Sequence, residues 1–337
     1  MARQIFEYHP TLGYRFIPGI KARVPHETGG YLIRVNNLGF RCDHQLSRAR
    51  PDSSRRLLLF GDSFTAGDGV SNGQRFGDVV ESRIDRLQVA NFGLPGSGTD
   101  QHYLIWREYG QALEHDLVVI AVLVENIRRV VARFRYYEDA VGAKAVYAKP
   151  WYTLEQGRLE LHGVPVRREP IPEAELDADQ RVAVDRGGRF GRLREVVNQL
   201  GLREVAQRVT RYQPVPEYDD PDDPAWQVMR ALLARWIGEC NVPVVLMPVP
   251  LYQFVEGTSD PGGYQARFAE LADECDATLH DPLPDLMSCD AAERRAMRFE
   301  RDPHLTRQGH AALGASLVPA IERALAGKSS EKEETGP

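Results

Sequence analysis

Cysteine is scarce in this sequence, and the few cysteines lie far apart. The four are Cys42, Cys240, Cys275 and Cys289, and no two of them form a C-x-x-C pair. Structural zinc sites and disulfide frameworks both need cysteines at closer, recurring spacings. The sequence therefore predicts neither, and no other pattern in it indicates a metal or a cofactor.

Long apolar runs and an excess of basic residues are also missing. No window approaches the roughly 18 apolar residues of a membrane span, and the first residues lack the basic start and apolar stretch of a secretory signal. The formal net charge is −6 and the pI is about 5.9, whereas nucleic-acid binders carry basic surfaces. We therefore expect a soluble, cytoplasmic protein with no membrane span and no nucleic-acid partner.

The composition is that of a large globular domain with distinct ends. Of the 337 residues, 42% are hydrophobic and 27% charged, which is ample for a sizeable core. Residues 1–50 are rich in glycine, proline and short alternating segments, which predicts a β-rich extension. Residues 51–326 form the main domain, and the charged tail 327–337 lacks apolar anchors, so we expect it to be disordered.

Short apolar runs alternate with helix-like stretches along the main domain. Such alternation is typical of βαβ units and of a mostly parallel sheet covered on both faces. The fold class is therefore predicted to be α/β, a flavodoxin-like doubly wound parallel sheet. The predicted strands are 56–60, 89–92, 117–123, 242–247 and a weaker 277–280, and the predicted helices are 76–87, 100–113, 193–209, 225–239, 265–275 and 308–326.

The third and fourth predicted strands are more than a hundred residues apart, too far for an ordinary crossover. We therefore expect a large insertion at about 128–216. Within it, residues 146–166 show two alternating segments around Glu155-Gln156-Gly157, which predicts a β-hairpin. Its aromatic residues Trp151 and Tyr152 could stack on a sugar or line an acyl pocket, or they could form the core of the insertion.

Ligands of open α/β sheets bind beyond the carboxyl ends of the strands, so the residues that follow each strand come first. Gly61-Asp62-Ser63 follows the first strand. A serine on such a turn exposes its hydroxyl near free backbone N–H groups, although Asp and Ser also serve as plain helix caps. A glycine-rich loop, 91–99, follows the second strand and could supply an oxyanion hole, a phosphate cradle or a mere turn.

Two further segments carry donor and acid–base groups. Glu125-Asn126 follows the third strand, where the asparagine could donate to a ligand or cap the next helix. Asp302-Pro303-His304 precedes the last helix. An aspartate so close to a histidine can orient the imidazole and stabilise its protonated form, as the base of a serine nucleophile requires.

The order of these four segments resembles the SGNH, or GDSL-like, hydrolase superfamily, whose four blocks supply Ser, Gly, Asn and His in turn. The resemblance spans the core from about Arg56 to Ala326. It implies a serine mechanism that needs no cofactor. It assigns the nucleophile and one oxyanion amide to Ser63, a second amide to Gly96, a side-chain oxyanion donor to Asn126, the base to His304 and the orienting acid to Asp302.

The sequence departs from the family pattern at two places. The third block usually reads Gly-Asn-Asp, but here Glu125 precedes Asn126, and a carboxylate near an oxyanion is unfavourable unless it is paired or points away. We also count Glu125 as a possible substrate contact. The acid often stands three residues before the histidine, where this chain has Arg301. The Asp-x-His spacing resembles a variant in SGNH proteins that modify polysaccharides, O-acetyltransferases among them.

By this resemblance, we expect a serine esterase that removes a short acyl group, acetyl, from a carbohydrate or a related small molecule. The N-terminal Leu12-Gly13-Tyr14 and residues 36–41 resemble the leader of bacterial SGNH proteins from polysaccharide and natural-product gene sets. An O-acyltransferase with the same triad is one alternative. A binding module that has kept the fold without turnover is another, and a small-ligand or nucleotide-binding protein is a third.

Overall fold

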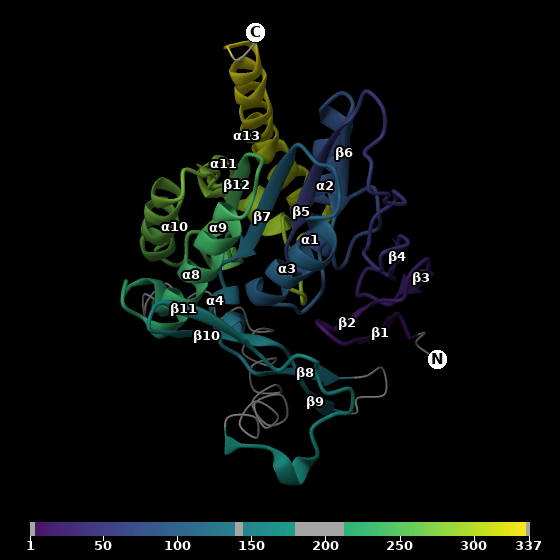
Figure 1. The fold of residues 1–337 in the computed structure, drawn as a ribbon, viewed down its shortest axis with the longest axis vertical. Helices are drawn as coiled ribbons and strands as arrows, with labels where there is room; N and C mark the ends of the chain where they lie inside the picture. The colour runs from purple at the N-terminus through teal and green to yellow at the C-terminus, as the bar shows by residue number, and fades with distance from the viewer. Residues whose placement is uncertain (1–3, 139–143, 179–211, 335–337) are drawn as a thin grey trace.

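The computed structural model of the chain describes residues 4–138, 144–178 and 212–334. Its centre is a five-stranded parallel sheet (Figure 1) with the strand order β13-β12-β7-β5-β6. In chain order this is 2-1-3-4-5, the flavodoxin-like order, which confirms the predicted fold class. The strands are β5 (Arg55–Phe60), β6 (Leu87–Asn91), β7 (Leu117–Leu123), β12 (Val244–Val249) and β13 (Thr278–Leu279).

Successive side chains of each strand enter two separate apolar layers. In β5, Leu57 and Leu59 pack on one face and Leu58 and Phe60 on the other, as the alternation of a strand requires. Because both faces are buried, the strands read as continuous apolar runs. The first face is covered by α2 (Phe76–Arg83) and α13 (Arg307–Glu334), and the second by α3 (Thr99–Ile105), α8 (Pro224–Gly238) and α10 (Gly262–Glu274).

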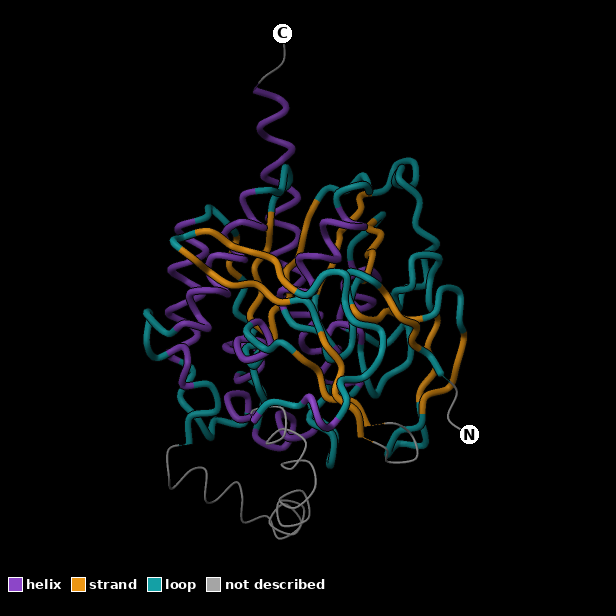
Figure 2. Tube along the Cα trace, turned by 60° about the horizontal axis from the view of Figure 1, so that its bottom comes forward, coloured by secondary structure: helices purple, strands orange, loops and turns teal. Residues whose placement is uncertain are grey.

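The N-terminal extension, for which the sequence predicts a β-rich segment, consists of two hairpins and is fastened to the main domain. The strands are β1 (Phe6–His9) with β2 (Gly13–Phe16) and β3 (Lys21–Val24) with β4 (Tyr31–Arg34). Arg41, which is fully buried, donates from Nη1 to the Gly67 carbonyl oxygen (2.6 Å) and from Nε to Asn72 Oδ1 (2.8 Å). The hairpins and the end of α13 lie on different sides of the molecule (Figure 2).

The insertion begins with α4 (Asn126–Val130) and forms two hairpins, which Figure 1 shows below the sheet, beyond α1, α3 and α4. The hairpin of β10 (Trp151–Glu155) and β11 (Arg158–His162) confirms the prediction, whereas the hairpin of β8 (Phe134–Glu138) and β9 (Lys144–Ala148) was not predicted. Short 3-10 turns follow at Glu173–Glu175 and Pro216–Tyr218. The predicted helix 193–209 lies outside the described residues.

Two predicted elements have different ends from those expected. The helix predicted over 100–113 is α-helical only to Ile105 and continues as a π-helical turn, Trp106–Gly110. Helix α13 reaches Glu334, so 327–334 is helical where the sequence predicts disorder; the lysines and glutamates of this stretch are strong helix formers and extend a helix that is already nucleated. The remaining short helices are α1 (Ser63–Ala66), α9 (Tyr252–Val255), α11 (Leu283–Met287) and α12 (Ala291–Ala296).

Candidate active site

Ser63 lies on the tight turn between β5 and α1, at the point where the strand order of the sheet reverses. The turn needs a glycine, because a Cβ added at Gly61 would lie 2.0 Å from Thr65 Oγ1 and 2.8 Å from the Ala121 carbonyl oxygen. Asp62 caps α1 by accepting from the Phe64 N–H (3.0 Å). The cap is therefore Asp62, and the Ser63 hydroxyl is left for another partner.

That partner is His304, on the loop before α13. Its Nε2 lies 2.7 Å from Ser63 Oγ, although the two residues are 241 positions apart in the chain. On the other side of the ring, Nδ1 is hydrogen bonded to Asp302 Oδ1, which also accepts from the His304 backbone N–H (2.9 Å). Asp302, two residues before the histidine, thus reaches the imidazole despite its unusual spacing, and the three side chains form one hydrogen-bonded chain.

The electrostatics of this chain favour a basic imidazole. Burial lowers the pKa of His304, but the hydrogen bond to Asp302 and the charges of Asp68, Asp302 and Asp62 outweigh it, so the pKa is raised above 6.5. Burial likewise raises the pKa of Asp302, but the hydrogen bonds from His304 prevail and lower it below 3.8. Asp302 is therefore ionised at neutral pH and can stabilise a protonated His304.

Asn126 stands at the start of α4, three residues after the end of β7, the strand next to β5. Its side chain is fully buried, yet among the described residues neither Nδ2 nor Oδ1 has a hydrogen-bond partner. Leaving a buried amide unpaired costs about 1–3 kcal/mol, so such groups are rare unless they have a use. The free Nδ2 donor is what an oxyanion site requires.

Gly96 lies in the loop between β6 and α3, in the left-handed conformation (φ +75°) that glycine adopts freely. A Cβ there would approach only the Tyr14 hydroxyl (3.5 Å) and Arg135 Nη2 (3.8 Å). The Gly98 N–H donates to Gln101 Oε1 (3.1 Å), whereas the Gly96 N–H has no acceptor among the described residues. Of these two loop glycines, Gly96 is thus the one whose amide is free to bind a ligand.

Arg129 explains why a glutamate is tolerated in the third block. Its Nη1 donates to Asp62 Oδ2 (2.9 Å), and its Nη2 lies 3.6 Å from Glu125 Oε2. Glu125 is therefore paired with a cation. Pairing is one of the two ways in which a carboxylate near an oxyanion becomes acceptable, the other being that it points away. A role for Glu125 in substrate binding stays a prediction. Arg129 was not among the residues predicted for the site, although its i,i+4 spacing from Glu125 was a usable signal.

A second serine–histidine pair in the chain is unsuited to catalysis. Ser97 Oγ lies 2.8 Å from His102 Nε2, but both residues are fully buried. Burial, together with the charges of Arg129 and Lys149, lowers the pKa of His102 to about 3. An imidazole with so low a pKa is a weak base, and the Ser97 hydroxyl already donates to the Leu94 carbonyl oxygen (2.6 Å), so this pair is a poor candidate for a nucleophile and its base.

The two aromatic residues predicted as possible substrate contacts have different surroundings. Tyr152 is 4% exposed and packs on Tyr103 of α3, with ring centroids 6.1 Å apart, so it belongs to the core and cannot stack on a sugar. The alternation of β10 turns Trp151 the other way, where it stacks on His162 (centroids 5.5 Å apart) under the Arg133 guanidinium. A contact between Trp151 and substrate stays a prediction.

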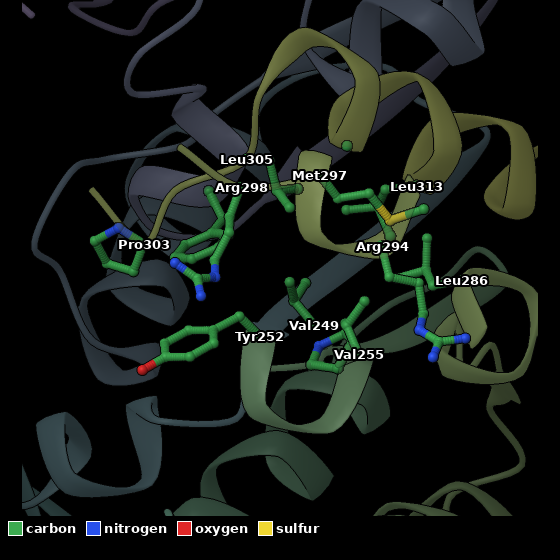
Figure 3. A pocket seen from close by; sticks show the side chains of 13 residues that line it. Val249, Tyr252, Val255, Leu286, Arg294, Met297, Arg298, Pro303, Leu305 and Leu313 are labelled. Carbon is green, nitrogen blue, oxygen red and sulfur yellow. The ribbon is translucent and has the colours of Figure 1, made fainter. Parts of the chain in front are cut away.

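An apolar cavity of about 20 Å³ lies beside the site (Figure 3). It extends between the end of β12 and the start of α13, and Phe64, Pro303 and Leu305, the neighbours of Ser63 and His304, contribute to its wall. Neither Ser63 nor His304 lines it, and the space holds about one water molecule. We therefore do not assign it to an acyl chain.

Two features that would indicate other functions are absent from the described residues. No cluster of three or more His, Cys, Asp or Glu side chains in this part of the chain is placed to hold a metal ion. Among the same residues, no helix combines the length and the apolar character needed to cross a bilayer.

A hydrogen-bonded Ser–His–Asp chain at the switch point of a flavodoxin-like sheet is the arrangement of a serine hydrolase. Consistent with this, residues 59–312 match the model of the GDSL-like Lipase/Acylhydrolase family. The chain therefore belongs to that family, which confirms the resemblance to the SGNH, or GDSL-like, superfamily and makes the protein a hydrolytic enzyme of the acylhydrolase and esterase class. No relative among the curated proteins matches the sequence.

The chain is also similar to solved structures that are distant from it in sequence. A lipolytic protein of the G-D-S-L family from Veillonella parvula is 10% identical (80% of this chain, all of that one, TM-score 0.41). A lipase/acylhydrolase from Enterococcus faecalis is 14% identical (80% and 96%, TM-score 0.42), and an acetyl xylan esterase is 13% identical (79% and 99%, TM-score 0.43).

Proposed function

We propose that the protein is a serine esterase that removes a short acyl group, acetyl, from a carbohydrate or a related small molecule through an acyl-enzyme on Ser63. The observation that carries the proposal is the hydrogen-bonded chain from Ser63 Oγ through His304 to Asp302. Such a chain supplies the nucleophile, its base and the group that orients the base.

The reaction then proceeds in two halves. His304 Nε2 takes the hydroxyl proton of Ser63 while Oγ attacks the ester carbonyl carbon, and the negative charge moves to the carbonyl oxygen. The backbone N–H groups of Ser63 and Gly96 and the Asn126 amide donate to this oxyanion. His304 gives its proton to the leaving alcohol oxygen as the ester bond breaks. It next takes a proton from water, whose oxygen attacks the acyl-enzyme, and it returns that proton to Ser63 Oγ as the acid leaves.

The proposed substrate is supported by the sequence. The Asp-x-His spacing and the N-terminal segments resemble those of polysaccharide-modifying SGNH proteins, which favours acetyl on a sugar. An acyl-enzyme can also pass its acyl group to an alcohol acceptor with the same residues, so O-acyltransfer is the second candidate. A cytoplasmic location stays a prediction.

The test is release of p-nitrophenol from acetyl through octanoyl esters, with and without sugar acceptors, by the wild type and by Ser63→Ala. We expect the acetyl ester to react fastest and the variant to lose the activity. Acylated sugar as the main product identifies a transferase. Equal activity in Ser63→Ala contradicts the serine mechanism, and no turnover of any ester, with or without an acceptor, favours a binding module.

A further inference from the structure

The loop that carries the catalytic histidine is held against the N-terminal extension. The loop closes on itself through a β-bridge between Arg298 and Leu305 and through the Phe299 N–H, which donates to the His304 carbonyl oxygen (3.2 Å). Its outer side is held by Glu27, whose carboxylate accepts from the backbone N–H groups of Glu300 (3.0 Å) and Arg301 (3.1 Å). The extension therefore contacts the catalytic loop directly.

His26 lies next to Glu27 and faces the triad. Its Nε2 is 3.4 Å from Asp302 Oδ2, the carboxylate oxygen that His304 does not use. The side chain is only 8% exposed, and its ring packs against Phe299 with the ring centroids 4.4 Å apart. No other described group pairs with this nitrogen, which lacks a hydrogen bond of good geometry in the free protein.

The other ring nitrogen of His26 indicates which tautomer is present. Nδ1 lies 3.4 Å from the backbone N of Thr28, which can only donate, and 3.0 Å from the Thr28 hydroxyl. When Nδ1 accepts, the proton of the neutral ring is on Nε2. That N–H then faces the ionised carboxylate of Asp302, and catalytic hydrogen bonds that are long in a free enzyme commonly shorten once substrate binds.

We propose that His26 is a positioning residue of the active site, holding one oxygen of the Asp302 carboxylate while the other oxygen orients His304. A carboxylate anchored at one oxygen only can rotate about its last bond, and the imidazole would follow it. Anchoring both oxygens fixes the plane in which His304 receives the Ser63 proton. On this proposal, which rests on the proposed serine mechanism, the N-terminal extension completes the active site.

The test compares two substitutions that keep different halves of the histidine. His26→Phe keeps the ring against Phe299 but removes the N–H, whereas His26→Gln loses the ring but keeps an N–H donor at about the position of Nε2. His44→Gln is the control, because His44 binds Glu81 outside the site. Each variant is assayed as the full chain with p-nitrophenyl acetate, and its Tm and its rate of labelling by a fluorophosphonate are measured.

We expect His26→Phe to lower kcat by about ten- to a hundredfold, the range for residues that orient a reactive group through another. KM and Tm should stay near the wild-type values, and His26→Gln should recover most of the rate. The acid limb of kcat/KM should shift to higher pH in His26→Phe alone. Without the second donor, Asp302 is a stronger acceptor and holds the proton on His304 more tightly, while Asp68 and Asp62 are unchanged.

The outcomes separate this inference from the function on which it rests. If His26→Phe has the same kcat and pH profile as the wild type while Ser63→Ala is inactive, the positioning role is overturned and the serine mechanism stands. Equal losses of rate and Tm in both His26 variants also overturn it, since they indicate packing. If neither turnover nor labelling depends on Ser63, the serine mechanism itself is wrong and the inference falls with it.

Discussion

Replacing Asn126 with leucine should separate catalysis from stability. Leucine has the same branching as asparagine but no polar atoms, and in this protein the Asn126 amide is buried without a described partner. Loss of one oxyanion donor lowers kcat by about a hundred- to a thousandfold, or about 2.7–4 kcal/mol. Removal of an unpaired buried amide relieves up to about 1–3 kcal/mol, so the folded state should be as stable as the wild type or more stable.

Asn91 provides a matched control, because it is equally buried but fully paired. Its Nδ2 donates to the Thr65 carbonyl oxygen (2.8 Å), and its Oδ1 accepts from the Gly93 N–H (2.8 Å). Asn91→Leu leaves both backbone groups without partners and should destabilise the protein by about 1–3 kcal/mol for each. Asn91→Leu should therefore lower the urea midpoint, whereas Asn126→Leu should raise it or leave it unchanged.

The assay pairs kcat for p-nitrophenyl acetate with urea unfolding followed by tryptophan fluorescence. If the free energy of unfolding of Asn126→Leu is more than about 1 kcal/mol below that of the wild type, the reasoning is refuted, because the amide is then already hydrogen bonded in the free enzyme. A loss of kcat below tenfold would refute the oxyanion role.

The activity and the stability should respond to three further changes. As pH falls, kcat/KM should fall with a midpoint above 6.5, because only neutral His304 can act as the base and its pKa is raised; a pH–rate profile checks this, and a midpoint below 6 contradicts it. Asp302→Asn should lower kcat by up to about 10⁴-fold through loss of the orienting carboxylate, measured by steady-state kinetics with Tm as the control. Lys149→Met should cost about 3–5 kcal/mol in urea unfolding, since it leaves Asp100 buried and unpaired, and adding Asp100→Asn should restore part of that loss.

The central sheet was readable from the sequence because burial on both faces leaves a continuous apolar run. For β7 the predicted and observed bounds agree, 117–123. The hairpin β8–β9 gave no such signal, because Arg135 interrupts the aromatic residues and packs its guanidinium on Tyr14, 3.6 Å from the ring centroid. Its strands pair with each other, outside the central sheet, so the apolar pattern that marks a sheet strand is weak.

The sequence predicted those residues of the site that belong to the family motifs. Ser63, His304 and Asp302 meet as expected from the family order of segments. The contact of Arg129 with Asp62 and that of His26 with Asp302 were not predictable, because they join segments that only the fold brings together. Of the contacts that these two residues make, only the i,i+4 pair of Arg129 with Glu125 follows a spacing pattern that a single sequence displays.

The most direct test of the account is to find which residue a serine-directed fluorophosphonate modifies, by mass spectrometry of the labelled protein and its peptides. The account predicts a single adduct on Ser63, absent in Ser63→Ala and formed at least a hundredfold more slowly in His304→Ala, as expected when a general base is lost. An adduct on Ser97, or esterase activity that survives in a protein whose Ser63 remains unmodified, would contradict it.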